Sequence, residues 1–271
     1  MKNNKYMISS IIFFLTETLF LHLGLNDLLK TGNIYSVLLG SFLSFIPIFI
    51  IIKIINKKPR INIFFKILLL IVFLIYFIYT IYLIKIYVQD KYLDSTPSII
   101  IIFLFILPIT YIKDIKTISK VSFILFLISS IIILFSIINL TALIEIDNFK
   151  PFFNISIIDI IKGSIKYMFY FIGPSIMIIM IPKNEINTKS ILIFYIISMI
   201  HMIILFILII GIFGIDLAKT YSYPEYSLMK KINYFDFIEH IENITTIEWL
   251  NSIFISSIIS VYSIKRIIKK E

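Results

Sequence analysis

The sequence predicts an all-α polytopic membrane protein of about eight transmembrane helices, and three observations lead to this fold class. First, 59% of the residues are hydrophobic, whereas soluble domains are roughly 45–50% apolar, and the mean hydropathy is +1.01. Second, the apolar runs are long and continuous, unlike the alternating strands of a membrane barrel. Third, at roughly 20 residues per crossing, the 271 residues leave no room for a soluble domain. We therefore expect a single transmembrane domain over 1–271.

The apolar runs mark eight expected spans, joined by brief loops except for residues 216–246. The spans are 7–25, 33–56, 62–87, 97–112, 119–144, 157–181, 190–215 and 247–264. Pro108 is expected to bend the short fourth span. In the long outer loop 216–246, Tyr223-Pro224 marks a turn. Apolar residues at helical spacing after it predict an amphipathic helix on the outer surface.

The distribution of basic residues predicts the orientation of the chain. Fifteen lysines and arginines fall in the two terminal segments and the loops on their side of the membrane, against seven in the opposite loops. Cytoplasmic loops carry the excess of such residues. The sequence therefore predicts an even number of spans, with both termini cytoplasmic.

Composition also excludes several classes of function. The chain has no cysteine, which removes disulfides, thiolate metal sites and thiol nucleophiles. His22, His201 and His240 lie far apart without metal-ligand spacing, so no metal site is expected. The net charge of +9 follows from the loop bias rather than from binding of nucleic acid. No hydrolytic triad, phosphate-binding glycine loop or pair of catalytic carboxylates is visible, so we expect neither an enzyme nor a cofactor.

Polar residues inside the spans are the candidate functional residues, because a charge in the bilayer is costly. Glu17 lies near the middle of the first span, between Thr16 and Thr18. It predicts a site for a substrate, proton or ion. The alternative is a protonated glutamate that is bonded to a neighbouring helix for structure alone.

The sixth span carries a second set of candidates. Lys166 lies too deep to reach the interface easily, and it shares one helical face with Tyr170 and Pro174. We expect it to bind a ligand or to pair with Glu17. The Gly173-Pro174 step is expected to kink or unwind the helix, as in the broken helices of transporters. A plain proline kink is the alternative.

Two polar stripes remain, on the third and eighth spans. Tyr76 belongs to a tyrosine stripe on the third span. The eighth carries a stripe of Glu248, Ser252, Ser256, Ser260 and Ser263. The serine stripe favours close helix packing, with a binding site as the alternative. Trp249 is expected to anchor the span at the membrane interface.

Several segments carry a resemblance to a known family. They are Asn148-Phe149-Lys150-Pro151-Phe152, then Tyr223-Pro224-Glu225-Tyr226-Ser227-Leu228-Met229-Lys230-Lys231-Ile232, then Phe235 to Glu242, and finally Glu248-Trp249. On these residues the chain resembles the spore germination permeases. These are the integral-membrane B subunits of nutrient germinant receptors, which are related to amino acid–polyamine–organocation transporters. The likeness is specific over about 145–255.

The resemblance implies an incomplete version of the ten-helix inverted-repeat transporter fold. The first repeat would cover about 7–144 and a partial second repeat about 157–264. The first and sixth helices would be discontinuous and line a small-molecule pocket, beside the third and eighth. The ligand-binding residues would then be Thr16, Glu17, Thr18, Tyr76, Lys166, Tyr170, Gly173, Pro174 and Ser256.

The function implied by the resemblance is that of a germinant receptor subunit in the cell or spore inner membrane. It would bind a small nutrient such as an amino acid and signal to partner receptor subunits. An ion-coupled amino acid permease and a non-binding membrane scaffold are the alternatives.

Overall fold

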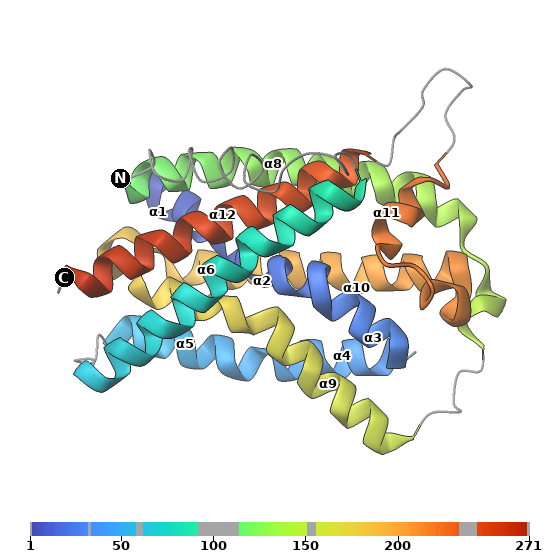
Figure 1. The fold of residues 1–271 in the computed structure, drawn as a ribbon, viewed down its shortest axis with the longest axis horizontal. Helices are drawn as coiled ribbons and strands as arrows, with labels where there is room; N and C mark the ends of the chain where they lie inside the picture. Colours follow the sequence, from blue (N-terminus) through green and yellow to red (C-terminus); the bar gives the residue numbers. More distant parts are fainter. Residues whose placement is uncertain are drawn as a thin grey trace.

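The computed structural model describes residues 2–31, 34–57, 62–91, 114–150, 156–232 and 243–269. Over these residues the chain forms helices joined by turns, with no β-strand, and the long helices run along one axis of the molecule (Figure 1). The elements are α1 (Lys2–Ser9), α2 (Ile11–Leu19), the π-helix η1 (Phe20–Gly24), α3 (Leu25–Thr31), α4 (Ile34–Leu43), α5 (Phe45–Lys57), α6 (Ile63–Lys91), α8 (Ile115–Leu140), the 3₁₀ helices η2 (Thr141–Leu143) and η3 (Ile146–Phe149), α9 (Ile157–Ile172), the 3₁₀ helices η4 (Gly173–Met180) and η5 (Lys183–Glu185), α10 (Thr188–Ala218), α11 (Pro224–Met229) and α12 (Asn243–Ile268).

Helices long and apolar enough to cross a membrane confirm the predicted fold class. Within the described residues there are 7 such stretches: Lys5–Leu29, Ile34–Lys57, Ile63–Val88, Ile115–Leu143, Ile157–Met180, Thr188–Ala218 and Asn243–Ile268. Each matches an expected span to within a few residues. The remaining expected span, 97–112 with Pro108, lies outside the described residues.

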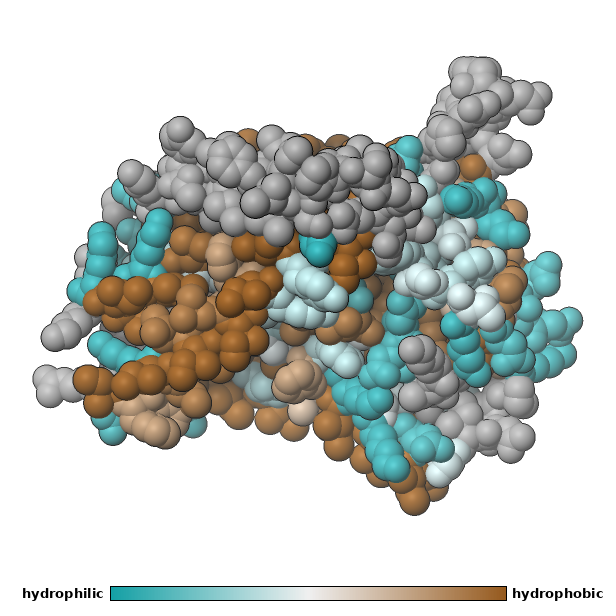
Figure 2. Space-filling view, in the orientation of Figure 1, coloured by the Kyte–Doolittle hydropathy of each residue, from teal (hydrophilic) through white to brown (hydrophobic). Residues whose placement is uncertain are grey.

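The first span lies at the centre of the bundle. Its apolar window is 89% buried, against 22% for Ile63–Val88 and for Ile115–Leu143. Helices α6 and α8 instead expose large apolar side chains such as Phe64 and Ile138. Figure 2 shows apolar residues along the flank of the molecule and hydrophilic residues gathered at its two ends. This distribution is the one expected of a protein surrounded by lipid.

Small residues set the packing of the second span against the sixth. A Cβ atom on Gly40 of α4 would lie 2.8 Å from the carbonyl oxygen of Ser164 on α9. One on Gly163 of α9 would clash with the Oγ of Ser36 on α4. Without these Cβ atoms the two helix backbones approach closely, which is the usual way that helices pack in membranes.

Several of the described spans depart from regular α-helix. The first passes through the π-helix Phe20–Gly24, and the sixth changes from α-helix to 3₁₀ helix at Gly173, as the Gly-Pro step predicted. Within α10, Gly214 has φ 69° and ψ 165°. The carbonyl of Gly211 accepts bonds from the backbone N–H of Glu145 and the side chain of Asn148, each at 2.9 Å. The loop after α8 thus fills the break in α10.

The two ends of the chain lie at the same end of the bundle (Figure 1). An even number of spans requires this arrangement. That this end faces the cytoplasm stays a prediction. In the loop 216–246, α11 begins at Pro224, within the predicted Tyr223-Pro224 turn. Most of the expected amphipathic helix falls on residues 233–242, outside the described residues.

Candidate functional site

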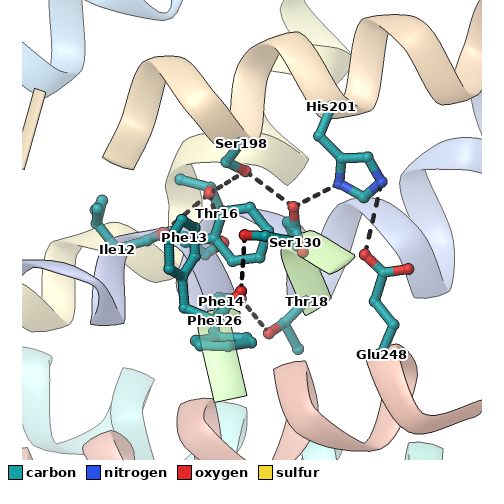
Figure 3. Close-up of polar contacts among 11 residues, drawn as sticks. Ile12, Phe13, Phe14, Thr16, Thr18, Phe126, Ser130, Ser198, His201 and Glu248 are labelled. Carbon is teal, nitrogen blue, oxygen red and sulfur yellow. Dashed lines mark hydrogen bonds and ion pairs between the residues drawn. The ribbon is translucent and has the colours of Figure 1, made fainter. Parts of the chain in front are cut away.

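A carboxylate, an imidazole and a second carboxylate meet in the centre of the bundle. Glu17 on α2 has its Oε1 2.7 Å from Nδ1 of His201 on α10. The other imidazole nitrogen, Nε2, lies 3.5 Å from Oε1 of Glu248 on α12. Figure 3 shows His201 pointing from α10 toward Glu248. All three side chains are buried. We call Glu17, His201 and Glu248 the acid–histidine cluster.

Hydroxyl groups satisfy part of the hydrogen-bonding capacity of this cluster. Ser198 lies one turn before His201 on α10, and its Oγ is 3.5 Å from Oε1 of Glu17 and accepts a bond of 2.7 Å from Thr16 (Figure 3). The second oxygen of Glu17, Oε2, has no hydrogen-bond partner, and Oε1 of Glu248 has no hydrogen bond beyond its 3.5 Å ion-pair contact with His201. Among the described residues, no lysine or arginine forms an ion pair with either carboxylate. The cluster therefore has unused acceptor oxygens in an apolar core.

A second polar group lies at Thr18, the residue after Glu17 on the first span. Thr18 Oγ1 is 2.6 Å from Ser256 Oγ and donates to the carbonyl of Ser252 at 3.0 Å. Tyr76 of α6 lies beside this pair. The serine stripe of α12 is buried against its neighbours. The stripe therefore packs α12 closely against the first and third spans.

Two hollows lie near the acid–histidine cluster. The smaller, of about 30 Å³, borders His201 and Glu248, and Thr245 and Glu225 add further polar groups to a mostly apolar wall. That volume holds about two water molecules. The larger, of about 550 Å³, has the size of a small-molecule site. We call the larger hollow the vestibule.

The residues that line the vestibule belong to the first span, α6, α12 and the segment between α10 and α11, at the end of the bundle opposite the termini (Figure 1). The vestibule is lined by His22, Leu23, Asn26, Tyr79, Tyr82, Leu83, Ile86, Lys219, Thr220, Tyr221, Ser222, Tyr223 and Trp249. These described residues include a lysine, an amide and several aromatic rings, but no carboxylate.

Trp249 borders both hollows. Its ring meets that of His22 edge-on at 3.9 Å between centroids and stacks on Tyr87 at 4.4 Å. Tyr223 adds a third ring at 5.2 Å. With 4% of its surface exposed, Trp249 is part of an internal aromatic wall. Its expected role as an interface anchor was wrong, because the neighbouring rings enclose it.

A third polar group lies near the vestibule end of the first span. Lys166 Nζ is 3.0 Å from Asp27 Oδ2 on α3, with side chains 48% and 32% exposed. Tyr170 donates to the same oxygen at 3.4 Å. The expected pairing of Lys166 with Glu17 is therefore wrong. Lys166 pairs with Asp27 instead, which lies ten residues after Glu17 and therefore about 15 Å further along the first span at 1.5 Å per residue.

Comparison with known proteins identifies the family. A family model described as spore germination protein matches residues 35–270. The chain belongs to this family. No curated protein and no solved structure gives a match. The family and the apolar helices together make the chain a germination-related, permease-like protein that crosses the membrane several times.

The structure of this spore germination protein divides the predicted ligand-binding residues among its polar groups. Those of the first span separate, with Thr16 and Glu17 at the acid–histidine cluster and Thr18 beside Tyr76 and Ser256. The sixth span contacts the first, since a Cβ on Gly173 would lie 4.0 Å from Leu19. The hollows described above are not lined by any of Thr16, Glu17, Thr18, Tyr76, Lys166, Tyr170, Gly173, Pro174 or Ser256. Their role in binding stays a prediction.

Sequence reasoning did not recognise His201 and Glu248 as partners of Glu17. His201 was set aside because the histidines lack metal-ligand spacing, and Glu248 was assigned to the packing stripe. Both lie inside apolar helices, where any ionisable residue is a candidate for function. That signal, applied to all spans of this spore germination protein, would have selected both residues.

Proposed function

We propose that this protein is the membrane subunit of a spore germinant receptor and that it binds a small nutrient in the vestibule. The observation that carries the proposal is a hollow of about 550 Å³, separated from a buried ionisable cluster by one aromatic wall. In the predicted topology this hollow faces outward, where a nutrient arrives.

The lining of the vestibule favours an amino acid. Lys219 provides a cation for a carboxylate, and its only described ion pair is a 3.5 Å contact with the exposed Asp216. Tyr79, Tyr82 and Trp249 provide aromatic surface for an apolar side chain. Because no described lining residue carries a negative charge, a zwitterion or anion is favoured over a simple cation.

Helix α12 provides a route for the signal. It carries Trp249 at the vestibule, Glu248 in the acid–histidine cluster, and Lys265 and Arg266 in its last turn. Arg266 donates to the carbonyl of Met180, at the end of the sixth span, at 2.6 Å. A nutrient that displaced Trp249 would shift α12, which reaches the opposite end of the bundle. Partner subunits bound at that end would respond to the movement of the helix.

Germination assays test the proposal. Spores with Lys219→Gln should need about tenfold more of an amino acid mixture for half-maximal response, since a hydrogen bond to a charged group contributes about 1.5–3 kcal/mol and tenfold is about 1.4 kcal/mol. Lys150→Gln is the matched control, because Lys150 is exposed, pairs with Asp147 and does not line the vestibule. Equal responses of the two variants would contradict binding in the vestibule.

An ion-coupled amino acid permease is the second candidate. The irregular segments in the first and sixth spans favour it, because transporters place their sites at such breaks. Uptake of amino acids into proteoliposomes that depends on an ion gradient, and that Glu17→Gln abolishes, would support the permease. If no ion gradient drives uptake, the permease is excluded and the receptor function is favoured.

A further inference from the structure

We propose that Glu17, His201 and Glu248 form a binding site for one divalent transition-metal ion, of the Mn²⁺ or Zn²⁺ class. This inference goes beyond the proposed receptor function and does not depend on it. Such a site was not predicted from the sequence, because its three ligands come from α2, α10 and α12 and lie far apart along the chain.

The donor atoms have suitable chemistry and spacing. One atom from each residue, a carboxylate oxygen or an imidazole nitrogen, lies within 4.8 Å of the other two. Two ligands at about 2.1 Å from a metal ion are at most about 4.2 Å apart. Ligands in a tetrahedral site are about 3.4 Å apart, so the most distant donor pair must close in by about 1.4 Å. Glu17 faces Nδ1 and Glu248 faces Nε2, so the imidazole must also turn to present one nitrogen to the ion, which the side-chain torsions permit. One imidazole with two carboxylates suits Mn²⁺, Fe²⁺ or Zn²⁺.

The two carboxyl groups have acceptor capacity that the protein itself does not use. Glu17 is fully buried, yet its Oε2 has no hydrogen-bond partner, and Oε1 of Glu248 has no hydrogen bond beyond its 3.5 Å ion-pair contact with His201. Buried polar atoms are nearly always partnered. An ion between these oxygens would satisfy both and would join three spans at one point.

Charge balance selects a divalent ion. Two carboxylates with a neutral imidazole carry a charge of −2, and the described residues offer them no lysine or arginine partner. A net charge in an apolar core is strongly disfavoured. One divalent cation neutralises the site, whereas one monovalent cation leaves a negative charge.

The adjoining cavity provides room and access. Its volume of about 30 Å³ borders His201 and Glu248 and holds about two water molecules. These would fill the coordination positions that three protein ligands leave open. Trp249 is shared with the vestibule. An ion could therefore reach the site from the vestibule by displacement of one ring.

Metal binding by the full chain in lipid nanodiscs tests the proposal. Protein stripped with EDTA is titrated with MnCl₂ or ZnCl₂, and the retained metal is measured after desalting. We expect about one ion per chain, with affinity at least tenfold lower in Glu17→Gln, His201→Gln and Glu248→Gln. Glu145→Gln, a change at an exposed carboxylate, should bind as the unaltered protein does. Equal metal retention in the cluster variants and this control would overturn the proposal.

A second measurement needs no variant. In Mn²⁺-loaded unaltered protein, pulsed electron paramagnetic resonance should detect ¹⁴N coupling from one imidazole. Absence of that coupling, or of stoichiometric metal, would show that the cluster consists of neutral acids bonded to a histidine. Neither measurement uses nutrient or spores. A negative result would therefore overturn the metal site and leave the receptor proposal untouched.

Discussion

The contact between the second and sixth spans makes a quantitative prediction for Gly40→Ala. The added Cβ atom would lie 2.8 Å from the carbonyl oxygen of Ser164 and 2.8 Å from Cβ of Tyr167. The first of these atoms belongs to the backbone, so no side-chain rotation relieves the clash. Helices α4 and α9 must separate by about half an ångström to restore ordinary contact distances.

The expected cost follows from measured effects of overpacking. Extra methyl groups in a well-packed core destabilise proteins by about 1–3 kcal/mol. Alanine also stabilises a helix by up to about 1 kcal/mol relative to glycine, which offsets part of the loss. We therefore expect Gly40→Ala to destabilise the protein by about 1–2 kcal/mol and to lower its thermal midpoint by several degrees.

Thermal unfolding in detergent, followed by size-exclusion chromatography, measures the effect. Gly173→Ala is the matched control, because its added Cβ would be 4.0 Å from Leu19, an ordinary contact. This control should lose less stability than Gly40→Ala, because apart from Leu19 its added Cβ meets, among the described residues, only the ring of Pro174, which disfavours helical geometry at the preceding residue. If Gly40→Ala and Gly173→Ala unfold together, close backbone approach does not hold these two spans.

The same unfolding assay tests three further changes. Gly214→Ala should destabilise the protein by about 1–3 kcal/mol, because φ 69° with ψ 165° is a region that only glycine adopts readily; an unchanged midpoint would contradict this backbone conformation. Lys166→Gln should cost at most about 1 kcal/mol, since its pair with Asp27 is partly exposed; a loss of several kcal/mol would indicate a buried pair instead. Tyr195→Phe should cost about 0.5–1.5 kcal/mol by removing the buried bond to Ser44, and Tyr6→Phe, a change at an exposed ring, serves as its control.

The spans could be predicted from the sequence because lipid imposes a local rule. Each crossing needs about 20 apolar residues with their backbone bonds made internally. The break at Gly173 was equally local, because proline removes a helix hydrogen bond. These features depend on neighbours along the chain, and the structure reproduces them.

The partners of the polar residues could not be predicted in the same way. Glu17 meets His201 across 184 positions, and the choice between His201 and Lys166 depends on which helices pack against the first span. Lys166 was expected to be deep from its position in an apolar run. The nearby Asp27 instead holds it in a half-exposed pair. Helix packing, rather than residue type, decides such pairings.

The π-helix Phe20–Gly24 determines which neighbours the acids of the first span can reach. At 100° per residue, Glu17 and Asp27 would be about 80° apart around an unbroken α-helix, but the extra residue of a π-turn increases this to about 180°. The first span thus presents one carboxyl group to His201 on α10 and another, on its opposite side, to Lys166 on α9. The number of residues in this short stretch, as much as their chemistry, therefore decides that the two carboxyl groups contact different helices.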